Sequence, residues 1–215
     1  MYNEHAPGEY YHIYNRGTQK QPIFENNTDK FRLLFLLLTF QGDISIKNIS
    51  REVKQSVQSQ TLHIKEDMEG DILKSRTVEL VAFCFMPNHF HLIVREIEEG
   101  GIAKYMQRVL TAYAKYFNTK YEMSGHLFQG TYKSVLIGSD LQLMHLSAYI
   151  HKNPSELKEW KGKEDKYPWS SYGDYVSKNR FGPLLITDII MDRYKKDEQS
   201  YKKFVKTSLA KEELI

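Results

Sequence analysis

The chain has 215 residues, of which 41% are hydrophobic and 27% charged, and its formal net charge is +3. That length suits one well-buried domain with appendages. A charge this small does not by itself indicate a nucleic-acid partner. Cys84 is the only cysteine, which excludes an internal disulfide and is typical of a reducing cytoplasm.

The sequence shows no sign of targeting to a membrane. The opening residues, MYNEHAPGEYY, lack a basic stretch followed by an apolar one, so we expect no signal peptide. The most apolar run, LLFLLLTF at 33–40, is too short to cross a bilayer. We therefore expect a soluble cytoplasmic protein without membrane contact.

The first half of the chain predicts a strand, a helix and an irregular segment. Residues 8–18 alternate in the manner of a strand that ends at Gly17. Residues 26–42 predict a helix, with Thr28 or Asp29 as its N-cap and Gly42 after its end. Residues 43–76 are polar and mixed, and we interpret them as a short helix plus a hairpin or mobile loop.

The second half predicts two strands, a helix, a strand and a second helix. The strands are VELVAFCFM and HFHLIVREI, and Pro87-Asn88 between them indicates a tight turn or bulge. Residues 101–122 keep a helical period and 125–137 are strand-like. Ser139 or Asp140 caps a helix that ends near Asn153. This order predicts an α+β fold, with helices packed on an antiparallel sheet.

Two histidines lie one residue apart in the second of these strands. Strand residues i and i+2 share a face, so His89 and His91 would stand side by side, while Phe90 between them points to the core. One interpretation is two histidines on a solvated face. The other is a metal site, which needs a third ligand from elsewhere in the chain, with phosphate oxygens able to complete the coordination.

A second cluster, SAYIHKNP, follows 58 residues after His91. Tyr149 and Asn153 are four residues apart and so share one helix face. A tyrosine hydroxyl can act as a covalent nucleophile, and a divalent ion beside a scissile phosphate would assist it. An asparagine carbonyl is a suitable oxygen ligand for such an ion. Tyr149 is one of 15 tyrosines, so a packed helix aromatic is the alternative interpretation.

Taken in order, MPNHFHLIV, YIHKNP and PWSSY resemble the single-tyrosine HUH transposases of the insertion sequence 200/605 type. The REP-associated tyrosine transposases are the closer match, because Asn followed by Pro is their pattern where the insertion-sequence branch usually has Gln. GHLFQGTYKS and the opening YYHIYNRG also resemble segments of this family. The resemblance covers roughly residues 8 to 175.

The resemblance implies a ferredoxin-like palm with the histidine pair on a central strand. In this family pattern His89, His91 and Asn153 hold a metal ion, Mg²⁺ or Mn²⁺, and Tyr149 is the nucleophile. The implied reaction cuts single-stranded or hairpin DNA and leaves a 5′-phosphotyrosine, and family members occur as monomers and as homodimers. We expect residues 1–175 to form the IS200-like catalytic domain, with 43–77 a probable insertion and 176–215 an extension of unknown role.

DNA binding also requires cations and aromatic side chains. Residues 101–137 carry five basic residues against one acidic residue, a local excess that could face phosphates or form a solvated face. Tyr10, Tyr14, Tyr132 and Phe128 are candidates for stacking on unpaired bases, or for the core. The candidate DNA-binding residues are Asn15, Arg16, Arg108, Lys115, Tyr132 and Lys133.

Two other functions remain open on the sequence alone. In a metal hydrolase, His89 and His91 would act with a carboxylate such as Glu96 or Glu79, and Tyr149 would be structural. In a domesticated nucleic-acid-binding protein, the chain would bind hairpins without cleaving them. The two interpretations predict, respectively, that Tyr149→Phe keeps activity and that no covalent adduct forms.

Overall fold

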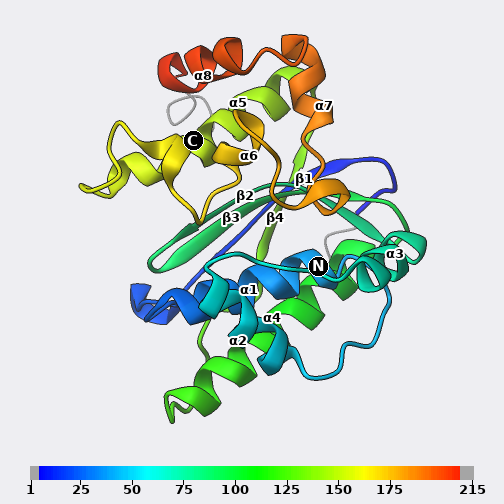
Figure 1. Cartoon of the computed structure of the whole chain (residues 1–215), viewed down its shortest axis with the longest axis vertical. Coiled ribbons are helices and arrows are strands. Elements are labelled where there is room, and N and C mark those ends of the chain that lie inside the picture. The colour runs from blue at the N-terminus through cyan, green and yellow to red at the C-terminus, as the bar shows by residue number, and fades with distance from the viewer. Residues whose placement is uncertain (1–4, 209–215) are drawn as a thin grey trace.

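The computed structural model describes residues 5–208, in which four strands form one antiparallel sheet in the spatial order β2-β3-β1-β4 (Figure 1). The strands are β1 Tyr10–Arg16, β2 Val78–Met86, β3 His89–Glu96 and β4 Lys133–Ile137. With α1 Asn27–Thr39 and α4 Gly101–Lys120 they give the order β-α-β-β-α-β. This is the ferredoxin-like arrangement, so the predicted fold class is confirmed.

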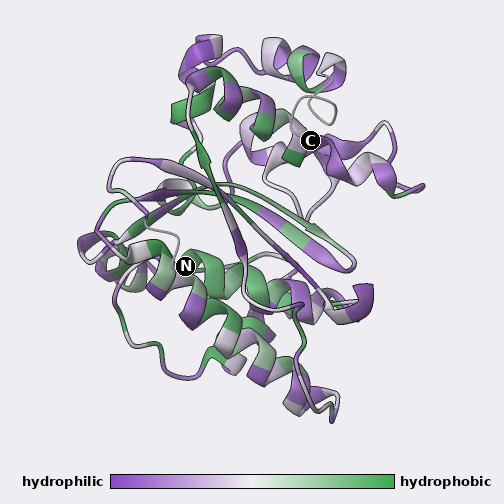
Figure 2. Cartoon of the chain, turned by 180° about the vertical axis from the view of Figure 1, so that it is seen from behind, coloured by the Kyte–Doolittle hydropathy of each residue, from purple (hydrophilic) through white to green (hydrophobic). Residues whose placement is uncertain are grey.

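One face of the sheet packs against α1 and α4, which lie together below it in Figure 1. The side chains that β3 directs to this face include Phe90, and Phe24 and Tyr113 join the same aromatic cluster. In Figure 2 the helices that pack on the sheet carry many hydrophobic residues, and the strands show hydrophobic and hydrophilic residues in succession. This layer is therefore the main hydrophobic core.

The N-terminus of α1 is fixed by a capping box whose N-cap lies two or three residues earlier than predicted. The side chain of Asn26 accepts hydrogen bonds from the backbone N–H groups of Thr28 and Asp29. The carboxylate of Asp29 accepts in return from the backbone of Asn26. Asn26 is thus the N-cap and Asp29 its reciprocal partner, a pairing that satisfies N–H groups which the first helical turn leaves without partners.

The opposite face is covered by α5 Asp140–Lys152 and by the C-terminal part of the chain. The side chain of Ser139 accepts from the backbone of Gln142, which confirms the predicted N-cap of α5. The remaining helices here are α6 Tyr172–Tyr175, α7 Asp188–Met191 and α8 Glu198–Thr207, and α8 packs on α5. Residues 209–215 lie outside the described part of the chain.

Two sequence predictions need correction. Residues 43–77 contain two helices, α2 Ile49–Ser59 and α3 Glu66–Lys74, and no hairpin. The segment 125–137 forms a strand only from Lys133 onward, because residues up to 132 make irregular contacts such as the hydrogen bond from Gln129 N–H to the Arg16 carbonyl.

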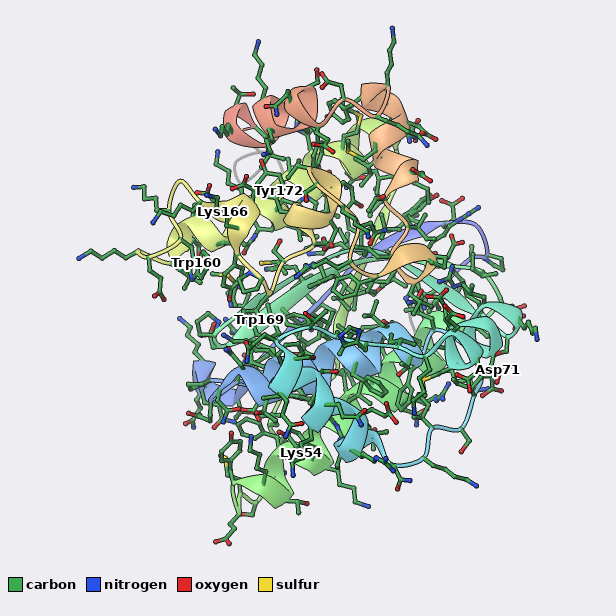
Figure 3. All side chains as sticks on the ribbon, viewed as in Figure 1. Lys54, Asp71, Trp160, Lys166, Trp169 and Tyr172 are labelled. Atoms are coloured by element: carbon green, nitrogen blue, oxygen red, sulfur yellow. The ribbon has the colours of Figure 1, made fainter. Side chains whose placement is uncertain are left out.

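The two edges of the sheet differ. Along β2, backbone hydrogen bonds from the segment 169–186 cover the edge, as between Phe85 N–H and the Trp169 carbonyl at 2.8 Å. Figure 3 shows Trp169 beside the sheet, between the two helical layers. On β4, at the other edge, Val135 and Leu136 are about half exposed, at 48% and 50%. Among residues 5–208, no helix has the length and apolar character needed to cross a membrane.

Candidate active site

The pairing of β1 with β3 places several polar side chains on the face that carries His89 and His91. Arg16 lies opposite His89 and Tyr14 opposite His91, so alternation also puts His12 on this face. Phe90 points to the other face, where its ring meets Phe128. The predicted division between a histidine face and a core face is therefore what the sheet shows.

The orientation of His89 is set by the turn that precedes it. Its Nδ1 lies 2.7 Å from the side-chain oxygen of Asn88, whose amide nitrogen donates to the Lys20 carbonyl at 3.1 Å. The loop that supplies this carbonyl turns tightly at Gly17, where an added Cβ would lie 2.2 Å from the Gln21 carbonyl oxygen. Because Asn88 presents oxygen to the ring, His89 carries its proton on Nδ1 and Nε2 is left to bind a ligand.

The second histidine of the pair is buried and contacts His12. Nδ1 of His91 lies 2.9 Å from Nε2 of His12, and the two rings are stacked. Burial lowers the pKa of His12 to about 4 and lowers that of His91 well below its ordinary value. Burial also lowers the pKa of His89. All three imidazoles are therefore neutral at pH 7, the state in which the ring can bind a metal ion.

Tyr149 reaches the pair from α5. Its ring stands edge-on to that of His91, with the centroids 5.5 Å apart. Leu143, Leu146 and Ile150 are buried on the same helix, and their spacing fixes its rotation on the sheet. The half-buried tyrosine is thus held at the histidine face within a single chain.

Asn153 completes the cluster at the end of α5. Its amide nitrogen donates to the Tyr149 carbonyl at 2.7 Å, which turns the amide oxygen away from the helix. The side chain also lies beside His89, where Glu156 and Asn153 oppose the lowering of the histidine pKa by burial. The structure thus brings together Tyr149, Asn153 and both histidines, residues that are widely separated in sequence.

These atoms fit a small divalent cation. Within residues 5–208 there is no group of three or more His, Cys, Asp or Glu side chains placed to hold a metal. The Asn153 amide oxygen is the neighbouring group that could add a third protein ligand to the two histidines. When Nδ1 of His89 donates to Asn88 and the amide nitrogen of Asn153 donates to the Tyr149 carbonyl, Nε2 of His89 and the Asn153 oxygen are both acceptors. Two acceptors in proximity are stabilised by a proton or a cation between them.

The carboxylates considered for a metal hydrolase lie elsewhere. Glu96 projects to the α4 side of the sheet, where its oxygens accept the backbone N–H groups of Gly101 and Ile102 at 3.0 and 2.7 Å. Glu79 pairs with Arg95, toward the opposite end of β3 from the histidines. Neither carboxylate shares a site with His89 and His91.

Comparison with known families agrees with this geometry. Residues 8–153 match the family described as Transposase IS200 like. The chain belongs to the IS200-like transposase family. This matched region spans the whole sheet and ends at Asn153, the last residue of the cluster.

A solved structure of a REP-associated tyrosine transposase bound to a REP hairpin has a similar fold. The TM-score is 0.53 at 14% sequence identity, and the alignment covers 86% of this chain and 89% of the other. No curated protein matches the chain. The structural likeness therefore supports the transposase fold independently of close sequence similarity.

Of the candidate DNA-binding residues of this transposase, two lie on the histidine face. Arg16 is exposed beside His89, with its Nε hydrogen-bonded to Gln129. Lys133 is exposed and lies opposite Tyr14 on β1. Tyr132, immediately before it, is half-buried against the hydrophobic core and lies near enough to Glu96 for the carboxylate to raise its pKa, in addition to the larger effect of burial. Arg16 and Lys133 therefore border the cluster on one side.

The other three lie apart from it. Asn15 is 5% exposed, points to the opposite face and donates to the Gly130 carbonyl at 3.3 Å. Arg108 donates to the carbonyls of Gly42 and Ile44 at 2.9 and 2.7 Å. Lys115 is exposed on α4, across the sheet from the histidines. The basic residues of α4 therefore do not gather at the site.

Sequence reasoning missed His12, and it named Tyr14 only as a candidate for stacking on bases or for the core. The ring of Tyr14 lies 5.8 Å from that of His91 and 4.8 Å from that of His12. Strand alternation in YYHIYNRG already placed both on one face. The sequence alone does not show that β1 pairs with β3, and this pairing places the two side chains beside the histidine pair on one face of the sheet.

Proposed function

We propose that this transposase cuts and rejoins single-stranded, hairpin-associated DNA through a 5′-phosphotyrosine on Tyr149. The observation that carries the proposal is the position of the Tyr149 ring, edge-on to His91, with Asn153 beside His89. A nucleophile and a candidate metal site thus share one solvent-facing end of the cluster. The solved relative bound to a REP hairpin supports a hairpin as the DNA partner.

In the proposed reaction, the Tyr149 oxygen attacks the scissile phosphorus. The bond between phosphorus and the 3′-oxygen breaks, the phenol proton passes to solvent, and the leaving oxygen takes up a proton as a free 3′-hydroxyl. Rejoining reverses these steps: a 3′-hydroxyl attacks the phosphotyrosine and releases the phenol. One bond is exchanged for another of the same kind, so no external energy source is required.

His89, His91 and Asn153 would hold the metal ion, Mg²⁺ or Mn²⁺. When bound, it supplies Lewis-acid polarisation of the scissile phosphoryl group. Asn153 also holds the last turn of α5 through the Tyr149 carbonyl, so the residue that would bind the ion also positions the nucleophile's backbone. This double role follows from the spacing of four residues.

The proposal extends to the surrounding residues. Arg16 and Lys133 would contact DNA directly, since they border the cluster. For Asn15, Arg108, Lys115 and Tyr132, contact with DNA requires a DNA strand that reaches beyond the histidine face. We further propose residues 1–175 as the catalytic domain, with 43–77 an insertion and 176–215 an extension, acting in the cytoplasm as a monomer or a homodimer.

The test is covalent capture of DNA. Wild-type protein is incubated with labelled single-stranded hairpin DNA and Mn²⁺, and a denaturing gel is examined for a protein-DNA adduct. Tyr149→Phe should bind the hairpin and form no adduct, because the phenyl ring has no atom that can attack phosphorus. An adduct with Tyr149→Phe would assign the nucleophile elsewhere, and hairpin binding without any wild-type adduct would indicate a binding protein that does not cleave.

Tyr14 provides the matched control, because it is the other tyrosine whose ring contacts His91. Tyr14→Phe keeps the aromatic ring and should still form the adduct. Tyr113 and Tyr116 would be less informative controls. Their hydroxyls donate to the Ile23 carbonyl and to Asp29 on the α4 side of the sheet. Mass spectrometry of the trapped peptide should place the phosphate on Tyr149.

A further inference from the structure

His12 of β1 makes a specific contact with the histidine pair. Its side chain projects from the same face of the sheet, one strand away from His91. Nε2 of His12 lies 2.9 Å from Nδ1 of His91, and the rings are nearly parallel, with an interplanar angle of 24°. At this separation one of the two nitrogens carries a hydrogen and the other accepts it.

The direction of this hydrogen bond decides whether His91 can bind a metal ion. If His12 donates, neutral His91 carries its proton on Nε2, and that nitrogen has no lone pair to offer. If Nδ1–H of His91 donates to His12, Nε2 keeps its lone pair. Only the second arrangement makes His91 a ligand, since a ring nitrogen binds a metal through its unprotonated form.

His89, the other histidine of the pair, also makes a hydrogen bond through Nδ1, and that hydrogen bond can have only one direction. Nδ1 of His89 faces the amide oxygen of Asn88, which can only accept. The amide is held in this orientation by the Lys20 carbonyl, which accepts from its nitrogen. His89 and His91 thus each have Nδ1 engaged by a neighbouring side chain, and a proton on Nδ1 would leave Nε2 of either ring available to a ligand.

We propose that His12 is a positioning residue that accepts the Nδ1–H of His91 and so keeps Nε2 of His91 available to a divalent cation. The inference rests on the proposed function in taking His91 as a ligand. It assigns to His12 a role that the His-x-His motif does not contain. A partner of this kind fixes both the tautomer and the orientation of a ligating imidazole.

Two substitutions separate an acceptor from a space-filling side chain. His12→Gln places an amide group near the position of the imidazole Nε2, and its oxygen can accept the hydrogen bond. His12→Leu fills a similar volume without an acceptor. Thermal unfolding of both variants establishes that each is folded before binding is measured. The wild-type protein is measured beside them in each experiment.

The first readout needs neither metal nor DNA. Long-range ¹⁵N–¹H correlation spectra of histidine-labelled, metal-free protein show which ring nitrogen of His91 carries the proton, with a His91→Gln variant to assign the signal. We expect the proton on Nδ1 in the wild type and in His12→Gln, and on Nε2 in most molecules of His12→Leu. A proton on Nε2 in the wild type overturns the proposal even if His12→Leu fails to fold.

The second readout is the affinity for Mn²⁺ alone, measured by the disappearance of the signal of free Mn²⁺ in electron paramagnetic resonance. The dissociation constant should rise by about 10- to 100-fold in His12→Leu. It should stay close to the wild-type value in His12→Gln. Equal affinities in all three folded proteins, or coupling of Mn²⁺ to three imidazole nitrogens rather than two, would overturn the assignment of His12 as a positioning residue.

These outcomes are distinct from failure of the proposed function. If the wild type binds Mn²⁺ and shows the expected tautomer but forms no adduct with hairpin DNA, the DNA-cleaving function fails while the role of His12 stands. If the adduct forms and the tautomer or affinity results are contrary, only the role of His12 fails.

Discussion

Two sets of buried histidines in this chain are held in different ways. His151, on α5, has both ring nitrogens hydrogen-bonded to hydroxyl groups, at 2.7 Å from Tyr201 and 2.8 Å from Ser171. Its ring also packs against Tyr172 and Tyr175. On the sheet, Nδ1 of His89 and of His91 is held by a neighbouring side chain, and the two rings lie beside Asn153 and Tyr149, respectively.

The contrast shows which histidines can act on a ligand. A ring with both nitrogens paired to internal hydroxyls is a structural cross-link, and His151 joins α5 to α6 and α8 in this way. It lies two residues after Tyr149, so the same helix carries the proposed nucleophile toward the sheet and a buried anchor toward the C-terminal part of the chain. Proximity in sequence to a catalytic motif therefore does not indicate a catalytic role.

The largest expected effect comes from removing either imidazole of the pair. His89→Ala and His91→Ala should each abolish formation of the DNA adduct, because each removes a proposed metal ligand. The fold should persist, since Phe90 continues to fill the core on the other face. Circular dichroism and the covalent-capture assay measure the two properties separately.

His151→Gln is the control for this comparison. Glutamine keeps hydrogen-bonding capacity at a buried site that does not face the cluster, so the folded variant should still form the adduct. Full adduct formation by His89→Ala or His91→Ala would remove the metal site. Loss of the adduct in folded His151→Gln would show that the buried anchor also controls the reaction.

Asn153 should have a smaller effect than the histidines. In Asn153→Ala, water can replace a neutral oxygen ligand, so we expect a loss of about 1.5 kcal/mol, or roughly tenfold, in cleavage rate. Asn153→Gln retains an amide oxygen and should lose less. Cleavage rates measured over a range of Mn²⁺ concentrations would show whether excess metal restores the alanine variant. A rate equal to the wild type at limiting Mn²⁺ would exclude Asn153 as a ligand.

The buried anchor should be detected through pH rather than through cleavage. Burial lowers the pKa of His151 to about 3, below the ordinary value of 6.5. Between these pH values the unfolded chain binds a proton that the folded chain does not, so stability falls as pH falls. The contribution of His151 is complete above about pH 6.5 and declines by about 1.4 kcal/mol for each unit of pH below it.

The measurement compares urea unfolding of the wild type and His151→Gln from pH 7 to pH 5. The other histidines are common to both proteins, so their contributions cancel in the difference. The stability advantage of the wild type should shrink as the pH falls. A difference that is constant across this range would mean that His151 titrates at its ordinary pKa in the folded protein.

The sequence predicted the parts of the fold whose signals are local. The β2-β3 pair, α4 and α5 were all expected from periodicity, turn residues and the Ser139 cap. Within 43–76 the sequence predicted one short helix, whereas the structure has two. The signal for α2 is weak, because Asn48, which precedes it, has a left-handed backbone conformation and makes no side-chain cap. Helix α2 depends on packing against α1, a tertiary contact that residue order does not reveal.

The candidate site divides in the same way. The family motif carried His89, His91, Tyr149 and Asn153, and the structure brings these four residues together. Whether a residue faces the site or the opposite layer depends on strand pairing and helix placement. The sequence alone does not show strand pairing or helix placement, so it does not distinguish Arg108 from Lys133 and does not place His12 at the site. Local patterns identified the chemistry, whereas the sheet topology decides which side chains are neighbours.

The smallest expected effect concerns the two cations that the sequence treated alike. Lys133 is exposed on the histidine side of β4, whereas the guanidinium of Arg108 is engaged by the carbonyls of Gly42 and Ile44 and lies over the Phe40 ring at 4.4 Å. Lys133→Gln should lower the salt slope of single-strand binding by about 0.7, the value for one lost phosphate contact. Arg108→Gln should leave the slope unchanged and lower the unfolding free energy by about 1 to 2 kcal/mol through the lost hydrogen bonds.

Binding measured from low to moderate salt, together with urea unfolding, separates the two effects. An unchanged slope in Lys133→Gln would make Lys133 a solvated surface residue, and a lowered slope in Arg108→Gln would mean that bound DNA extends across the sheet to α4.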